Sequence, residues 1–89
     1  MMWKIDPDKT FLRRANKLLK KNPNLKKKYT ELYIKLANDP FDLTLHTHAL
    51  TGDLKGKYAC SLTYELRIVF KLSDDIVHLL DVGSHDEVY

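Results

Sequence analysis

The first forty positions alternate between apolar and charged residues at the spacing of amphipathic helices. Apolar residues recur three to four positions apart in two successive stretches, so each stretch presents one apolar face. These residues are Phe11, Ala15, Leu18 and Leu19 in the first stretch and Leu25, Tyr29, Leu32 and Leu36 in the second. The short break at Asn22-Pro23-Asn24 favours an antiparallel helical hairpin. Asp6 followed by Pro7 predicts the N-cap and the first position of the first helix.

The remaining pattern has a period of two and predicts strands. Trp3-Lys4-Ile5 is a short candidate at the start, and longer candidates lie at about 57–62, 64–72 and 76–82. The turns at Thr63 and at Ser73-Asp74-Asp75 are short, so these three strands are expected to pair antiparallel. The predicted order is β-α-α-β-β-β. The sequence therefore predicts one α+β domain over residues 1–89, a twisted antiparallel sheet with the N-terminal helical hairpin packed on one face.

The strand predicted at 64–72 has two chemically different faces. One face carries Leu66, Ile68 and Phe70, and the other carries Glu65, Arg67, Val69 and Lys71. If the helices cover the apolar face, Glu65 and Arg67 lie on the open face of the sheet. An arginine in that position, with a carboxylate two residues before it, could hold a phosphate.

Composition narrows the class of protein. The chain has 89 residues and 44% hydrophobic residues, which suits a single globular domain. The lone Cys60 excludes an intramolecular disulfide and a cysteine-based zinc site, and its strand position favours a buried hydrophobe. No apolar run approaches the ~20 residues of a membrane span, and the N-terminus leads into charge. We expect a soluble, cytoplasmic protein without membrane association.

The charges are unevenly distributed along the chain. Residues 1–40 hold 11 Lys or Arg against 4 Asp or Glu, a net +7, whereas residues 41–89 hold 4 against 8, a net −4. A basic first half indicates a polyanion or an acidic partner segment. Solvated helix lysines are the plain alternative. The cations of the first helix are Arg13, Arg14, Lys17, Lys20 and Lys21.

Several side chains that could act together are predicted on or beside the open face of the sheet. They are His48, Lys55, Lys57, Glu65, Arg67, His85 and Tyr89, joined by Ser61 if the strand register allows. RNA cleavage needs such a set: a base for the 2′-hydroxyl, cations for the phosphorane and an acid for the leaving 5′-oxygen. The alternatives are solvated histidines, an ordinary ion pair between Glu65 and Arg67, and a frayed terminus at Tyr89.

A metal site is not predicted from these residues. His46-x-His48 has metal-ligand spacing, but no third ligand is evident. His46 and His78 are interpreted as structural or solvated. We therefore expect neither a metal nor another cofactor.

Three motifs carry a family resemblance. They are Leu50-x-Gly52-x-Leu54-Lys55-Gly56, then Glu65-x-Arg67-Ile68-Val69-Phe70, and the tail Gly83-Ser84-His85-Asp86-Glu87-Val88-Tyr89. Together they resemble the RelE/ParE toxin superfamily, and within it the YafQ-like branch of bacterial type II toxin–antitoxin systems. The similarity covers nearly the whole chain, since the two basic helices and the strand order also match.

The resemblance implies an mRNA interferase, an endoribonuclease that cuts mRNA in the ribosomal A site without metal and is restrained by a cognate antitoxin. His48 matches the family's loop histidine and His85 its proton-transferring tail histidine. Tyr89 stands at a tail aromatic, and Arg67 matches the strand arginine that contacts the scissile phosphate in RelE-like members. On this reading His48 or Glu65 is the base and His85 the acid. Arg67, Lys55 and Lys57 would contact mRNA, and the cations of the first helix ribosomal RNA.

The chain also departs from the family pattern. Ser61 stands where YafQ-like toxins carry a histidine, and Glu65 replaces an aspartate with an arm one methylene longer. Two other functions therefore stay open. One is a ParE-like gyrase inhibitor, which shares the fold and acts by binding protein. The other is a catalytically weak module that binds antitoxin.

Overall fold

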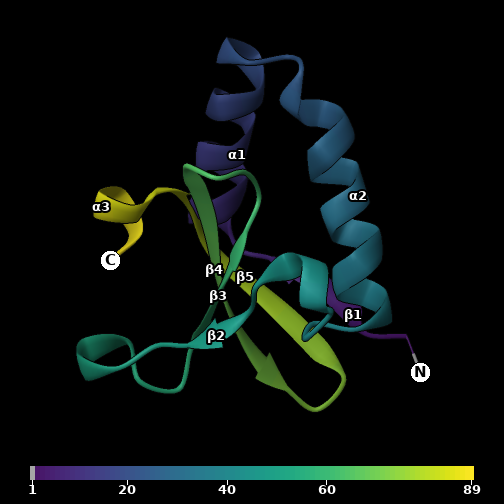
Figure 1. Cartoon of the computed structure of the whole chain (residues 1–89), viewed down its shortest axis with the longest axis vertical. Helices are drawn as coiled ribbons and strands as arrows, with labels where there is room; N and C mark the ends of the chain where they lie inside the picture. Colours follow the sequence, from purple (N-terminus) through teal and green to yellow (C-terminus); the bar gives the residue numbers. More distant parts are fainter. Residues whose placement is uncertain (1) are drawn as a thin grey trace.

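The computed structural model describes residues 2–89, which form one sheet and three α-helices. The strands are β1 (Lys4–Pro7), β2 (His48–Ala49), β3 (Tyr58–Ser61), β4 (Leu66–Ser73) and β5 (Ile76–Ser84). The helices are α1 (Lys9–Lys21), α2 (Leu25–Asn38) and the four-residue α3 (His85–Val88), and single 3₁₀ turns lie at Leu43–Leu45 and Gly52–Leu54. The helical hairpin stands on the sheet, and the C-terminus lies on the other side (Figure 1). No helix within residues 2–89 has the length and apolar character needed to cross a bilayer.

The sheet has the strand order β1-β5-β4-β3-β2. Consecutive strands from β2 to β5 pair antiparallel, as predicted, but β1 runs parallel to β5. Short turns impose antiparallel pairing only on strands that follow one another, and β1 is separated from β5 by most of the chain. The predicted α+β class is confirmed, and the sheet is mixed rather than wholly antiparallel. The short strand β2 and the helix α3 were not predicted.

The start of α1 differs from the prediction. Asp8, not Asp6, is the N-cap, and its carboxylate accepts a hydrogen bond from the Phe11 amide at 2.8 Å. Pro7 ends β1 instead of opening the helix, and the Asp6 carboxylate lies 3.3 Å from His78 on β5. Pairing with β5 carries the strand two residues further than local sequence signals predict. Pairing with β5 therefore determines the conformation of Asp6 and Pro7, and not their local preference for a helix start.

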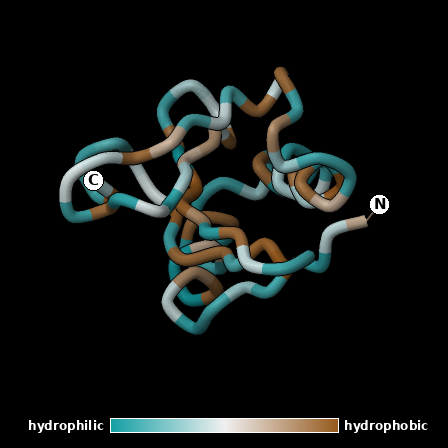
Figure 2. The backbone as a smooth tube through the Cα atoms, turned by 90° about the horizontal axis from the view of Figure 1, so that it is seen from below, coloured by the Kyte–Doolittle hydropathy of each residue, from teal (hydrophilic) through white to brown (hydrophobic). Residues whose placement is uncertain are grey.

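The core lies between the helical hairpin and one face of the sheet. Phe11 and Ala15 of α1 and Leu32 and Leu36 of α2 are buried there. The strands contribute Cys60, Ile68, Phe70, Val77, Leu79 and Val82. Apolar segments run through the middle of the molecule and hydrophilic ones around its edge (Figure 2). Leu19, predicted as part of the apolar face, is only half-buried and does not join this core.

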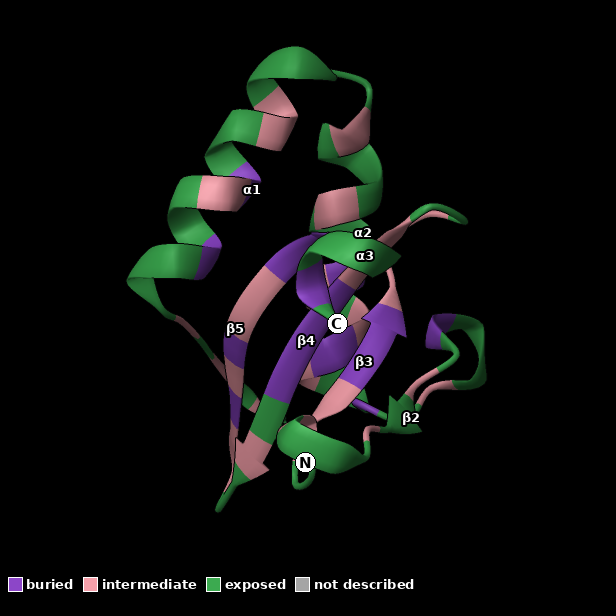
Figure 3. Cartoon of the chain, turned by 90° about the vertical axis from the view of Figure 1, so that its left-hand side faces the viewer, coloured by how far each residue is buried: buried purple, intermediate pink, exposed green. Residues whose placement is uncertain are grey.

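The opposite face of the sheet is partly covered by the C-terminal turn. Val69 pairs with Ala59, and both are buried although neither belongs to the core beneath the helices. Helix α3 packs on β4 and β5 on this second face (Figure 3), and its Val88 is buried. The face that carries Arg67 is therefore closed at one end by the C-terminal residues. This closure brings the tail to the candidate site.

Two neighbouring residues of α1 test the position of the core. Phe11 is fully buried against the sheet and Tyr29, whereas Leu12 is 40% exposed. Phe11→Ala should lower the free energy of unfolding by about 3–5 kcal/mol, because it removes a buried ring and leaves a cavity. Leu12→Ala should change it by less than about 1 kcal/mol. Urea denaturation followed by circular dichroism measures both, and equal effects would contradict this core.

Candidate active site

The C-terminal turn is built by a capping box. The Ser84 hydroxyl accepts a hydrogen bond from the Glu87 amide at 3.4 Å, and the Glu87 carboxylate accepts one from the Ser84 amide at 2.8 Å. This exchange lowers the pKa of Glu87, chiefly through the Ser84 amide. Gly83 makes room for it, since an added Cβ there would lie 3.1 Å from a Glu87 carboxylate oxygen. The chain can therefore leave β5 directly into α3.

Helix α3 brings two of the predicted residues together. His85 and Tyr89 are four residues apart and so face the same side of a helical turn. Their rings meet edge to face, with centroids 4.3 Å apart. The Tyr89 hydroxyl also lies 3.5 Å from His48 Nε2 on β2. Tyr89 is therefore not a frayed terminus but the contact between the loop histidine and the tail histidine.

The backbone selects one tautomer of His48. Its Nδ1 lies 3.2 Å from the carbonyl oxygen of His46. A carbonyl can only accept, so Nδ1 carries the proton in the neutral ring and Nε2 keeps a free lone pair. That lone pair is directed to the Tyr89 hydroxyl. In this neutral tautomer Nε2 can accept a proton, as a general base must.

Arg67 has a structural contact that the sequence did not reveal. Its Nη1 donates to the carbonyl oxygens of Thr63 and Tyr64, both at 2.8 Å, and lies 3.3 Å from that of Leu66. The guanidinium thus holds the β3–β4 loop. Its positive charge also lowers the pKa of Tyr89, although burial has the larger effect and raises that pKa overall. Arg67 and His48, the histidine that the Tyr89 hydroxyl approaches, line one groove.

Glu65 is placed differently from the prediction. It lies in the loop before β4 rather than on the strand, and it is exposed. Within residues 2–89 its carboxylate makes no hydrogen bond or ion pair with Arg67. The prediction that Glu65 and Arg67 share one face of a strand is therefore wrong, and residues 2–89 do not show the alternative, an ordinary ion pair between the two. The reason is that the paired residues of β3 and β4 end at Ser61 and Arg67, so strand alternation does not extend to position 65.

Ser61 does join Arg67, because the two residues are paired across β3 and β4. Both line a groove that also contains His48 and that we call the site groove. Its lining is Thr44, His46, His48, Ser61, Leu62, Thr63, Tyr64 and Arg67. Among residues 2–89 no three His, Cys, Asp or Glu side chains are grouped to hold a metal. Burial raises the pKa of Cys60 to about 12, which suits its place in the core and not a nucleophile.

The predicted RNA-binding cations belong to two elements, the β2–β3 loop and α1. Lys55 and Lys57 lie in the β2–β3 loop, where Gly52 and Gly56 take left-handed conformations. This loop and α3 project from the same side of the sheet (Figure 1).

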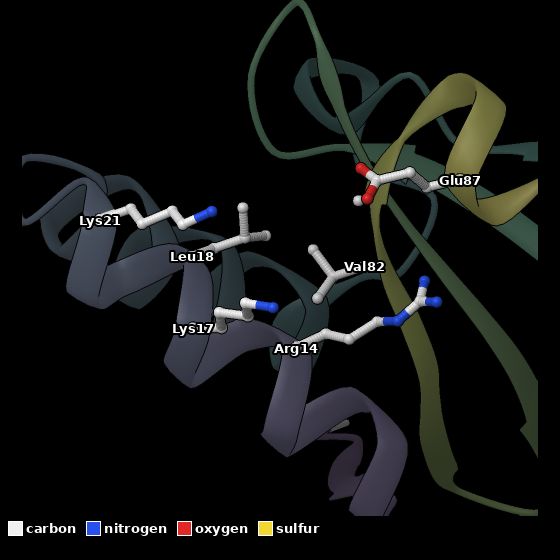
Figure 4. Close-up of a pocket in the computed structure, with 7 residues that line it drawn as sticks. Arg14, Lys17, Leu18, Lys21, Val82 and Glu87 are labelled. Carbon is white, nitrogen blue, oxygen red and sulfur yellow. The ribbon is translucent and has the colours of Figure 1, made fainter.

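The cations of α1 divide into two sets. Arg14, Lys17 and Lys21 line a second groove together with Val82, Gly83 and Glu87 (Figure 4). Arg14 is paired with Asp81 at 2.9 Å. Arg13 and Lys20 are exposed outside this groove.

Sequence reasoning missed two elements that position the site. One is the capping box, although Ser84-x-x-Glu87 is a known start signal for a helix. The other is the loop at 62–65, whose Thr63 hydroxyl accepts a hydrogen bond from the Leu66 amide at 3.1 Å. No local signal marks the bond from Arg67 to this loop, because it depends on the fold of the hairpin.

Comparison with known proteins gives a consistent picture. The family described as bacterial toxin of type II toxin–antitoxin system, YafQ, matches residues 3–89. A copper-bound mutant toxin from Helicobacter pylori is 29% identical, with coverage of 99% of this chain and 100% of that chain and a TM-score of 0.84. None of the curated proteins that were compared matches the chain.

Two more distant structures share the fold. The DinJ–YafQ toxin–antitoxin complex of E. coli contains a chain that is 20% identical, with coverage of 100% of this chain and 99% of that chain and a TM-score of 0.80. The YoeB/ParE toxin from Agrobacterium tumefaciens is 18% identical, with coverage of 92% and 98% and a TM-score of 0.81.

The capping box can be tested at Gly83. Gly83→Ala should displace the Glu87 side chain, because the new Cβ would lie 3.2 Å from the Glu87 Cβ. Ser84→Ala removes the hydroxyl acceptor and should act in the same direction. In both variants the nuclear Overhauser contact between the His85 and Tyr89 rings should weaken, while the core signals of Phe70 and Leu79 stay unchanged. An intact ring contact in both variants would contradict the role given to the capping box.

Proposed function

Since the chain belongs to the YafQ family, the toxins of bacterial type II toxin–antitoxin systems, we propose that it is an endoribonuclease that cuts mRNA on the ribosome. One observation carries the proposal. The Tyr89 hydroxyl lies 3.5 Å from Nε2 of His48, and the Tyr89 ring contacts His85. The phenol of Tyr89 therefore contacts both imidazoles, and Arg67 lines the groove that also contains His48.

This arrangement supports cleavage by attack of the 2′-hydroxyl. His48 Nε2 takes the proton of the 2′-hydroxyl, whose oxygen then forms a bond to the adjacent phosphorus. The bond from phosphorus to the 5′-oxygen breaks, and protonated His85 donates its proton to that oxygen. The products are a 2′,3′-cyclic phosphate and a free 5′-hydroxyl. In this scheme the side chains of the protein carry both proton transfers, and no metal ion bound to the protein takes part.

Arg67 and Tyr89 would support the two proton transfers. The Nη1 of Arg67 is engaged by loop carbonyls, which leaves its Nε and Nη2 for the oxygens of the phosphorane. The Tyr89 hydroxyl would hold the His48 ring in place through Nε2. The 2′-hydroxyl of the substrate would then take the place of the Tyr89 hydroxyl at that nitrogen. His48 is preferred to Glu65 as the base, since Glu65 is exposed on a loop and does not line the site groove, whereas His48 does.

Ribosomal RNA would be held by the cations around the site. Lys17 and Lys21 of α1 line the groove beside α3, whereas Lys55 and Lys57 of the β2–β3 loop would contact the mRNA. Arg13 and Lys20 extend the basic surface along α1, and Arg14 contributes the part of its charge not neutralised by Asp81. Such contacts act through phosphate and give affinity without sequence preference.

A cognate antitoxin is the proposed protein partner. In the E. coli complex the antitoxin DinJ is bound to YafQ, a protein with the fold of this chain. By analogy, an acidic antitoxin segment would compete for the basic surface of α1. Antitoxin binding also supplies a measure of correct folding that does not depend on catalysis.

The proton-transfer roles can be tested in cell-free translation of a reporter mRNA, with breaks mapped by primer extension. His48→Ala and His85→Ala should each reduce cutting by about 10²–10⁴-fold and leave antitoxin binding intact. His78→Ala is the matched control, since His78 binds Ser73 and Asp6 away from the cluster.

Two results would redirect the assignment. Intact mRNA with the wild-type protein, together with inhibited supercoiling by gyrase, would favour the ParE-like alternative. Intact mRNA with tight antitoxin binding alone would favour a catalytically weak module, in line with the serine at position 61.

The basic surface predicts a dependence on salt. Lys17→Ala combined with Lys21→Ala should weaken binding to ribosomes, and the logarithmic salt slope should fall by about 0.7–0.9 for each phosphate that is no longer neutralised. Lys26→Ala combined with Lys27→Ala is the control, because these lysines lie at the far tip of the hairpin. Sedimentation with ribosomes at increasing salt measures both. Identical slopes in the two double variants would place ribosome binding elsewhere.

A further inference from the structure

The β3–β4 loop at residues 62–65 is an ordered structure rather than a free turn. Its carbonyl oxygens at Thr63 and Tyr64 both accept from Arg67 at 2.8 Å. From the other side, the Thr63 hydroxyl accepts from the amides of Glu65 and Leu66 at 3.3 and 3.1 Å. The Leu62 amide also donates to the Leu66 carbonyl at 2.9 Å. These bonds hold the backbone on both sides of Tyr64.

The Tyr64 side chain is presented to solvent by this loop. It is 92% exposed, although burying an aromatic ring of this size would be favourable. Tyr64 lines the site groove together with His48 and Arg67. Because the backbone on both sides of Tyr64 is already held in place, only the side chain of Tyr64 has to be ordered when the ring stacks on a flat partner.

We propose that Tyr64 stacks on a nucleobase of the mRNA next to the scissile phosphate and contributes to the choice of cleavage site. The inference rests on the proposed ribonuclease function and extends it to a residue with no part in proton transfer. Bases in single-stranded RNA are commonly bound by stacking on tyrosine. The surrounding groove favours a polynucleotide, since Arg67 provides a positive charge and His46 and His48 provide imidazole nitrogens at the same surface.

Arg67 links the two parts of this subsite. Its Nη1 fixes the loop that carries Tyr64, while the remainder of the guanidinium is directed to the phosphate under the proposed mechanism. A phosphate bound at Arg67 would therefore lie at a set distance from the stacked base. Register of the mRNA relative to His48 and His85 would follow from this spacing.

The test measures single-turnover cutting of mRNA on programmed ribosomes as the toxin concentration is varied. Tyr64→Ala and Tyr64→Leu should raise the half-saturating concentration by about tenfold, the effect expected for removing one base–aromatic stack. The saturating rate should change by less than about threefold, and the preferred nucleotides at the cut should become less distinct. Tyr64→Phe and Tyr64→Trp keep an aromatic ring and should behave like the wild type.

Leu43→Ala is the matched control, because Leu43 is 91% exposed but lies outside the site groove. It should leave cutting unchanged. Antitoxin affinity, measured for every variant, shows whether the fold is intact.

Three outcomes would overturn the inference. Equal cutting and equal preference in wild type and Tyr64→Ala would show that the ring does not contact RNA, while leaving the ribonuclease function in place. Weakened antitoxin binding with unchanged cutting would assign Tyr64 to the protein interface instead. Absence of cutting by the wild type would remove the ribonuclease function itself, and this inference with it.

Discussion

The turn from β5 into α3 is the constraint on which the candidate site depends. A chain leaving the last strand of a sheet would normally continue into solvent, and its final residues would be mobile. Here the reciprocal hydrogen bonds of Ser84 and Glu87 turn it at once, and Gly83 leaves space for the Glu87 side chain. Val88 then anchors the turn by burial. As a result, His85 and Tyr89 lie over the sheet beside His48.

One face of the sheet carries the hydrophobic core, and the other carries the residues of the candidate site. Ile68 and Phe70 point into the core beneath the helices, whereas Arg67 points to the opposite face. The site is therefore assembled on the outer side of strands that the core holds rigid. That separation lets polar and charged groups gather at one surface without being buried in the interior, where unpaired charge would be strongly destabilising. A domain of 89 residues can therefore hold a hydrophobic core on one face of the sheet and a polar site on the other.

Arg67 shows how structural and chemical roles overlap in a small site. One guanidinium nitrogen holds the β3–β4 loop, and the same group acts electrostatically on Tyr89. Truncation of this side chain would remove a charge and release the loop together, so its effect on activity alone would not separate the two roles. A substitution of Tyr64 separates these two roles better, because Tyr64 lies in the loop that Arg67 holds but carries no charge itself.

The sequence alone determined the class of fold, the helical hairpin, the antiparallel order of the last strands and the family, and each of these is confirmed. Such features follow from short-range periodicity, turn residues and motif spacing. It also pointed to His48, His85 and Tyr89, which the tertiary structure brings into contact, and to Arg67, which lines the same groove as His48.

Only the tertiary structure decided the parallel pairing of β1, the N-cap at Asp8 and the exclusion of Glu65 from the strand. These depend on contacts between residues far apart in the chain, and strand alternation cannot show where two strands separate. The same holds for the loop carbonyls bound by Arg67 and for the tautomer of His48. Their geometry exists only after the hairpins and the C-terminal turn have packed together.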